Sequence, residues 1–405
     1  MGRILLSRVA VAALLTLYDA AAQLTSFPLC RGNPAASYSD AGNTYPQVKK
    51  ALSQVSQYQI ATWWTDNNAY HYTEMQKLLN NCNDTSVPTV VIYGLPNKDC
   101  GAAFSNLGTN RDADTYVKFV QDLADLVGTR PVNYILEPDA IGLTLNAPCA
   151  LTSGYLDNMM SVVPLLTGDN NPNASLYLDV GYWALQNEST TSVVVQAVKQ
   201  LASKGGAIRG IALDTSNYRT TTEMVGLCTT FSAAAYKSMR KNFTCVVDTS
   251  RNYIGPKDGS REWCNSKFAA IGVPPTSATQ SDLLDYFLWI KTPGESDGPC
   301  NTPDITGDAL KNGPPAGQFF EKAFSMMWDQ GYFVDKKLGD KLNEYAIDGA
   351  STSGMSVSWI VIVIVVAVLV FLVVGGIVMK RRHDAKEARS RNTRQVRLLQ
   401  ESAAL

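Results

Sequence analysis

Seven short apolar runs recur between residues 59 and 297, and stretches with helical periodicity separate them. In residues 113–127, Tyr116, Phe119, Val120 and Leu123 follow the three- and four-residue spacing of a helix with one apolar face. Strands and helices that alternate over this length predict an α/β fold with a parallel sheet, either open or closed into a barrel. The expected strands are Gln59–Trp64, Thr89–Tyr93, Asn133–Leu136, Leu176–Val180, Ile208–Leu213, Phe243–Val247 and Tyr286–Ile290.

Composition excludes several classes of function. The chain has 35 Lys and Arg against 36 Asp and Glu, so a strongly basic nucleic-acid-binding face is not expected. Its two histidines, His71 and His383, are too few for a multi-histidine metal site, and only His71 could serve a Ser-His-Asp or Cys-His site in the body of the chain. No G-x-G-x-x-G motif follows the first expected strand. We therefore expect no metal and no cofactor.

Acidic residues stand at the carboxyl ends of six successive expected strands. In a parallel barrel these ends meet on one face, where the active site is built. One such aspartate is ordinarily a helix N-cap, but six in succession favour either acid–base chemistry by carboxylates or a Ca²⁺ site. The acids are dispersed and lack EF-hand spacing, so calcium is the second choice. The residues are Asp99, Glu137, Asp139, Asp179, Asp214, Asp248, Glu295 and Asp297.

Aromatic residues share these strand ends. A flat aromatic face beside carboxylates suits a sugar ring, whose C–H faces are apolar while its hydroxyls need hydrogen-bond partners. For any single tryptophan, burial in the core is the more common role. The aromatic residues are Trp63, Trp64, Tyr93, Tyr182, Trp183, Tyr218, Tyr253, Trp263 and Trp289.

The two ends of the chain have the composition of targeting and membrane segments. Residues 1–22 have the basic start, short apolar stretch and small-residue end of a signal peptide, with an uncleaved anchor as the alternative. Trp359–Val378 is uncharged and long enough to span a bilayer, so we predict a transmembrane helix over 359–379. A basic tail, residues 380–405, follows it and predicts a cytoplasmic C-terminus. A lipid-anchor tail that is removed is the alternative.

The remaining boundaries follow from these ends. We expect a domain over residues 23–334 and a stalk over 335–358. The domain would then lie outside the cell, attached to the plasma membrane in type I orientation. Its even number of cysteines allows up to four disulfides in such an oxidising compartment. The cysteines are Cys30, Cys82, Cys100, Cys149, Cys228, Cys245, Cys264 and Cys300, and the N-glycosylation sequons stand at Asn83, Asn173, Asn187 and Asn242.

Six local strings carry a family resemblance. They are residues 93–100 (YGLPNKDC), 136–139 (LEPD), 176–179 (LYLD), 248–252 (DTSRN), 263–265 (WCN) and 289–298 (WIKTPGESDG). In this order they resemble the signatures of glycoside hydrolase family 6, the family of cellobiohydrolase II and related endoglucanases. The resemblance runs from about residue 63 to residue 332. Together the strings are specific, whereas E-P-D alone would not be.

The resemblance implies a distorted barrel of about seven parallel strands and hydrolysis of β-1,4-glucan with inversion at the anomeric carbon. By the family pattern Asp139 is the general acid, and the neighbouring Asp99 carboxylate raises its pKa. Two routes for the base stay open. In the first, a water held by Ser105 passes its proton toward Asp99. In the second, the carboxylate of Asp297 activates the water directly.

Further residues match substrate contacts of the family. Tyr93 matches a tyrosine that crowds the sugar and favours ring distortion. The resemblance assigns hydrogen bonding of sugar hydroxyls to Lys291, Glu295 and Asp179, and stacking to Trp63, Trp263 and Trp289. Tyr182 and Asn217 are further candidate sugar contacts.

This sequence departs from the family in the fourth string. Residues 179–182 read D-V-G-Y where the family usually has D-A-G-H, so one sugar-binding histidine is replaced by Tyr182. The tryptophans that normally follow are out of register, and only Trp183 lies close. Matched cysteines imply the disulfides Cys100–Cys149 and Cys264–Cys300. The pairing of the other four cysteines stays open.

The mode of attack is predicted from one loop. Exo-acting members roof the active site with long loops, whereas here only Pro299 separates Gly298 from Cys300. We therefore expect an open groove and a monomeric, membrane-tethered enzyme that cuts glucan chains internally. The alternatives are an exo-acting cellobiohydrolase, a non-catalytic glucan-binding membrane protein and a structural wall-linking glycoprotein.

Overall fold

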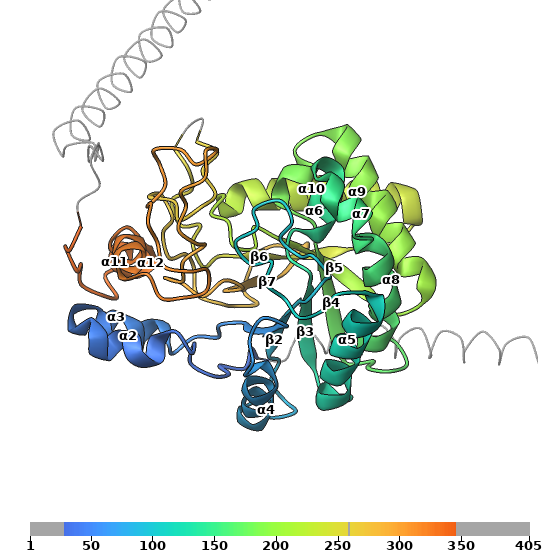
Figure 1. The fold of residues 1–405 in the computed structure, drawn as a ribbon, viewed down its shortest axis with the longest axis horizontal. Helices are drawn as coiled ribbons and strands as arrows, with labels where there is room; N and C mark the ends of the chain where they lie inside the picture. Colours follow the sequence, from blue (N-terminus) through green and yellow to red (C-terminus); the bar gives the residue numbers. More distant parts are fainter. Residues whose placement is uncertain (1–27, 258–259, 346–405) are drawn as a thin grey trace, which may run out of the picture. The chain divides into compact units, whose positions relative to one another are not determined.

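Seven parallel strands form one sheet, in which each strand pairs with its neighbour in the sequence (Figure 1). The computed structural model describes residues 28–257 and 260–345, and the strands and helices named below lie in these ranges. The strands are β1 (Thr62–Thr65), β2 (Thr89–Tyr93), β3 (Val132–Leu136), β4 (Ala174–Asp179), β5 (Ile208–Leu213), β6 (Thr244–Asp248) and β7 (Leu284–Leu288). The seven strands and their parallel direction confirm the sequence prediction.

The sheet curls into a distorted barrel with a seam between β1 and β7. Within the described residues these two strands share no paired ladder. Two hydrogen bonds cross the seam instead. The Ala61 N–H donates to the Trp289 carbonyl over 2.9 Å, and the Trp63 indole N–H donates to the Ile290 carbonyl, also over 2.9 Å. The seam lies beside the first tryptophan predicted to bind sugar.

Helices cover the outer face of the sheet. In Figure 1 the helices drawn in green lie on one side of the strands, and the N-terminal helices α2 and α3 lie near α11 and α12. Hydrogen bonds such as Gln54 to the Leu338 carbonyl join these two ends of the domain. The α-helices are α2 (Tyr38–Thr44), α3 (Lys49–Val55), α4 (His71–Asn81), α5 (Ala113–Val127), α6 (Ala140–Asn146), α7 (Pro148–Thr152), α8 (Tyr155–Leu166), α9 (Glu188–Leu201), α10 (Thr221–Met239), α11 (Glu321–Asp329) and α12 (Tyr332–Asp335). Short 3₁₀ turns lie at η1 (Pro46–Val48), η2 (Tyr182–Leu185) and η3 (Ala202–Lys204).

Helix α5 shows how local sequence fixes an element. Its first turn is capped by Asp112, whose carboxylate accepts the Thr115 N–H over 2.9 Å. The chain leaves the helix at Gly128, which has a φ of 59°, a conformation that glycine adopts with little strain. The apolar stripe between these signals is buried, and the helix spans the predicted residues 113–127.

Two apolar layers flank the sheet. Side chains that point inward fill the barrel, among them Val91, Ile135, Tyr177 and Val246. Alternate residues of the same strands point outward and pack against the helices in a larger cluster that includes Ile92. This alternation follows from the two-residue period of a strand. Because both faces of the sheet are packed, the strand ends and the loops that follow them are held in place.

Four disulfides connect the eight cysteines. Cys100–Cys149 and Cys264–Cys300 confirm the two pairs that the family resemblance implied. The four cysteines whose pairing was open form Cys30–Cys82 and Cys228–Cys245. Two of the bridges hold loops at the carboxyl ends of strands.

The expected boundary at residue 334 is too early. Residues 336–345 pack on the domain, because the Trp328 indole N–H donates to the Asp340 carbonyl over 2.8 Å and Asp329 accepts the Leu342 and Asn343 N–H groups. The chain divides into two units, Met1–Ala346 and Ile347–Leu405. The first part of the predicted stalk therefore belongs to the domain, and its remainder lies outside the described residues.

The predicted signal peptide and membrane span also fall outside the described residues. Within residues 28–257 and 260–345, no helix has the length and apolar character needed to cross a bilayer. The predictions for 1–22 and 359–379 therefore stay predictions.

Candidate active site

A long groove runs across the carboxyl ends of the strands. The loops after all seven strands contribute to its lining, together with part of the N-terminal segment 33–43. Of the thirteen catalytic and substrate-binding residues predicted from sequence, the groove brings together Trp63, Tyr93, Asp99, Ser105, Asp139, Tyr182, Asn217, Trp263, Lys291, Glu295 and Asp297. The other two, Asp179 and Trp289, do not line it.

Asp139 lies directly before helix α6, with a φ of 67° that turns the chain out of β3. Its backbone N–H donates to a carboxylate oxygen of Asp179 over 2.8 Å. Burial raises the pKa of Asp139 well above its usual value, and the negative charges of Asp179, Asp99 and Asp297 raise it further. Asp139 therefore keeps its proton under conditions in which an ordinary aspartate has lost it.

Asp179 lies beneath the groove and does not contact it directly. At the end of β4 it is 1% exposed, and one oxygen accepts N–H groups from Asp139 and Gly181. Burial raises the pKa of Asp179 to about 6. The predicted hydrogen bond from Asp179 to sugar needs correction. Side chains alternate between the two faces of a strand, and the side chain of Asp179 lies on the buried face. There it accepts the backbone N–H of Asp139.

Asp99 follows β2 in a turn closed by its own side chain. Its carboxylate accepts the Ser105 N–H over 2.6 Å. Burial raises the pKa of Asp99, although backbone hydrogen bonds from the loop oppose the rise. The Ser105 side chain lines the groove next to this carboxylate. Asp99 is thus a more basic carboxylate than one in water.

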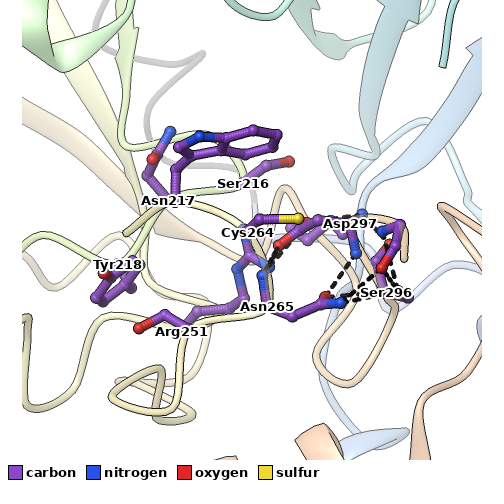
Figure 2. A network of polar contacts seen from close by, with 12 residues as sticks. Ser216, Asn217, Tyr218, Arg251, Cys264, Asn265, Ser296 and Asp297 are labelled. Atoms are coloured by element: carbon purple, nitrogen blue, oxygen red, sulfur yellow. Dashed lines mark hydrogen bonds and ion pairs between the residues drawn. The ribbon is translucent and has the colours of Figure 1, made fainter. Parts of the chain in front are cut away.

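Asp297 has the opposite electrostatic setting (Figure 2). Both its oxygens accept from one Arg251 nitrogen, at 3.0 and 2.8 Å, and the Lys291 ammonium lies 3.6 Å away. The Asn265 N–H donates to the same carboxylate over 2.9 Å. Burial opposes ionisation, but Arg251 and Lys291 outweigh it and lower the pKa of Asp297. This carboxylate stays ionised.

Of the nine aromatic residues predicted at the strand ends, five line the groove and four do not. Those in the groove are Trp63, Tyr93, Tyr182, Trp183 and Trp263, and the others are Trp64, Tyr218, Tyr253 and Trp289. Trp63 meets Tyr93 edge to face with ring centroids 5.6 Å apart, and Trp263 also lines the groove. Trp289 is 1% exposed and packs against Tyr58, so its predicted stacking role needs correction. The reason is strand periodicity, since Leu288 and Ile290 on either side of it point into the barrel.

Tyr182, which replaces the family histidine, lies against two neighbours. Its ring meets Trp183 edge to face, and the Arg219 guanidinium lies 5.5 Å from its centroid. Both Tyr182 and Trp183 line the groove. The rings of Tyr182 and Trp183 therefore line the groove at the position where the family usually has a histidine.

Sequence reasoning missed the cations beneath the site. Lys98 forms a buried ion pair with Asp66, and its ammonium lies 5.4 Å from the Tyr93 ring centroid. Arg251 is the main partner of Asp297. Lys98 and Arg251 stand inside two of the recognised strings, and a search for partners of buried carboxylates would have pointed to them.

The predicted ring of acids also contains residues with a structural role. Asp248, at the end of β6, is buried and accepts backbone N–H groups of Ser216, Ser250, Ile290 and Lys291. These bonds join the loops after β5, β6 and β7. Asp248 therefore positions groove residues and takes no part in the groove surface.

Comparison with known proteins agrees with this geometry. The model of the family described as "Glycosyl hydrolases family 6" matches residues 33–330. The chain belongs to glycosyl hydrolase family 6. Membership confirms the resemblance stated from the six strings, and it covers nearly all of the described domain.

Named relatives of this family 6 chain include both endoglucanases and cellobiohydrolases. Endoglucanase A of Thermobispora bispora is 33% identical over 225 residues, which cover 54% of this chain and 46% of that protein. The probable 1,4-beta-D-glucan cellobiohydrolase C of Aspergillus clavatus is 28% identical over 278 residues, 58% of either protein. The chain spans about half the length of the curated relatives it matches.

Solved structures have the same fold. A family 6 enzyme of Orpinomyces sp. Y102 superposes with a TM-score of 0.66 at 24% identity, covering 76% of this chain and 98% of that one. The endoglucanase Cel6 from Mycobacterium tuberculosis gives a TM-score of 0.61 at 25% identity, with the same coverage. That structure holds a thio-linked cellobioside ligand.

Proposed function

We propose that this family 6 protein hydrolyses β-1,4-glucosidic bonds of cellulose or a related β-glucan with inversion. The observation that carries the proposal is the presence in one groove of Asp139, whose pKa is raised by burial and nearby acids, and Asp297, whose pKa is lowered by Arg251 and Lys291 against burial. Two carboxyl groups held in different protonation states are what acid-catalysed glycoside hydrolysis requires. Relatives named endoglucanase and cellobiohydrolase support the substrate class.

In the proposed reaction Asp139 donates its proton to the glycosidic oxygen while the C1–O bond breaks. A water molecule attacks C1 from the opposite face of the sugar, so the product is the α-anomer. The proton of this water leaves toward Asp99, with Ser105 holding the water. Asp99 suits this role better than Asp297, because its pKa is raised whereas two cations lower the basicity of Asp297.

Other groove residues serve binding. Trp63 and Trp263 offer apolar faces to glucosyl rings, and Tyr93 stands beside Trp63, where it crowds the sugar ring. Lys291 and Glu295 offer a donor and an acceptor for hydroxyls from the loop after β7. Tyr182 and Asn217, from the loops after β4 and β5, add an aromatic ring and an amide to the lining.

The decisive experiment follows the anomers formed from cellohexaose by the full-length chain. Proton NMR should show the α-anomer first, with the β-anomer appearing by mutarotation. An initial excess of β-anomer would contradict inversion. Binding without any hydrolysis would favour the non-catalytic glucan-binding alternative.

We also propose that the enzyme cuts glucan chains internally. Only Pro299 separates Gly298 from Cys300, and the Cys264–Cys300 disulfide holds the chain at that point. Such a short segment leaves little chain with which to roof the groove. The assay compares loss of viscosity with reducing ends formed on carboxymethyl cellulose. Little loss of viscosity, with cellobiose as the main early product, would favour a cellobiohydrolase.

We further propose that the domain is displayed outside the cell by residues 359–379, as a monomer in type I orientation. The sequence of the two ends supports this placement. The four sequon asparagines, Asn83, Asn173, Asn187 and Asn242, are all exposed and could carry glycans. Protease added to intact cells should release the domain and leave a small basic fragment. Full-length protein in the soluble secreted fraction would contradict the anchor.

A further inference from the structure

Phe104 is an aromatic residue of the groove to which neither the family resemblance nor the proposed mechanism gives a role. It lies in the loop between β2 and α5, five residues after Asp99, and its side chain is half-buried. Its ring centroid lies 5.8 Å from that of Trp263, and the two planes are inclined by 35°. Trp263 comes from the loop after β6, so the contact joins two loops that are distant in the sequence.

The spacing of the two rings leaves no room for a sugar between them. Carbon atoms in contact lie about 3.5–4.0 Å apart, so a pyranose held between two flat rings separates them by roughly 7–8 Å. The observed 5.8 Å is shorter than this. A glucosyl unit therefore cannot enter between the two rings while they keep this contact.

The Phe104 side chain packs in an apolar site. With Trp263 it packs on a cluster formed by the Cys264–Cys300 disulfide, Ile305 and Ala309. Gly298 leaves the space that the ring occupies, since a Cβ at this position would lie 3.0 Å from the Phe104 ring. Its φ of 135° also favours glycine. The ring thus rests in a site that the surrounding loops leave open for it.

The loop that carries Phe104 is strained and connected to the catalytic carboxylates. Asn97, Asp99 and Ala103 all have positive φ values, between 53° and 60°. Asparagine and aspartate tolerate this region, but alanine does so less readily. The next residue after Phe104, Ser105, donates its N–H to Asp99. The backbone that follows Phe104 is thus held by the Asp99 carboxylate.

We propose that Phe104 determines how readily glucan enters the groove: its ring covers Trp263 and must be displaced before a glucosyl unit can stack there. The inference rests on the proposed function, because it takes Trp263 as a sugar platform. Opening costs the Phe104–Trp263 contact. The residue acts on binding and takes no part in bond cleavage.

The test compares Phe104→Ala with Leu107→Ala in the full-length chain. Leu107 lies in the same loop, but its side chain is 83% exposed and does not line the groove, so it controls for loop effects. Removing the Phe104 ring should lower the KM for cellohexaose by roughly 2- to 12-fold, the factor that one aromatic contact supplies. The kcat should change little. Leu107→Ala should leave both constants unchanged.

Calorimetry gives a second readout. In the full-length chain carrying Asp139→Asn, addition of Phe104→Ala should tighten cellohexaose binding by the same factor, and Phe104→Leu should give a smaller gain because it keeps apolar bulk without a flat ring. An unchanged or weaker affinity for Phe104→Ala would overturn the inference and show that Phe104 forms part of the platform. Failure of the parent chain to bind or cut cellohexaose would instead overturn the proposed function, and this inference with it.

Discussion

Replacement of Asp139 by asparagine should abolish most hydrolysis and preserve the fold. Asparagine is close to aspartate in shape, tolerates the φ of 67°, and keeps the backbone N–H bonded to Asp179. What it lacks is the proton that the buried carboxyl group holds. General acid catalysis contributes about 10²- to 10⁴-fold, or about 3 to 5 kcal/mol of barrier, so kcat on cellohexaose should fall by this factor.

The leaving group separates loss of the acid from other damage. A dinitrophenyl cellobioside needs little protonation, so Asp139→Asn should slow its cleavage far less than that of cellohexaose. Asp282→Asn, which alters an exposed carboxyl before β7, is the matched control and should behave like the wild type. Near-normal cleavage of cellohexaose by Asp139→Asn, or an equal loss on both substrates, would refute the assignment. Asp139→Ala is a poorer variant, because alanine is strained at this φ.

Three further predictions follow from the same geometry. Asp179→Asn removes a negative charge that raises the pKa of Asp139, so the alkaline limb of the kcat profile should move to lower pH by roughly one unit or more; an unmoved limb would contradict the coupling. Lys98→Met leaves Asp66 buried without its partner and should cost roughly 3–5 kcal/mol in urea unfolding; a loss below about 1 kcal/mol would contradict the burial of the pair. Replacing both cysteines of the Cys100–Cys149 disulfide by serine should cost about 4 kcal/mol, since the bridge closes a 49-residue separation. Free thiols at these positions in the wild type would contradict that bridge.

The fold could be predicted from sequence because strand and helix periodicities are local. The runs Thr89–Tyr93 and Ile208–Leu213 coincide with β2 and β5 residue for residue, since turn residues bound them closely. The last run, Tyr286–Ile290, is displaced from β7 by two residues. The apolar run continues past the last residue of the strand, because Trp289 and Ile290 are buried by side-chain packing outside the strand ladder.

The site was harder to predict, because the side of a strand on which a side chain lies and the partners of buried charges depend on the tertiary structure. A string such as 289–298 identifies a tryptophan but does not say which side of the strand it faces, and Trp289 faces the core. The same limit applies to Asp179, which lies below the groove. The string 248–252 contains Arg251 but does not show that its partner is Asp297, and the contact of Phe104 with Trp263 likewise joins loops that are distant in the chain.

The charges around the groove explain how three aspartates can serve one reaction. All are removed from water, which by itself raises each pKa. Arg251 and Lys291 lie beside Asp297, and the negative charges of Asp179, Asp99 and Asp297 act together on Asp139. The result is a graded set in which Asp297 loses its proton first and Asp139 last. If Asp99 accepts the proton of the attacking water, activity must lie between the pKa of Asp99 and the higher pKa of Asp139, which gives a bell-shaped profile whose two limbs respond to different substitutions.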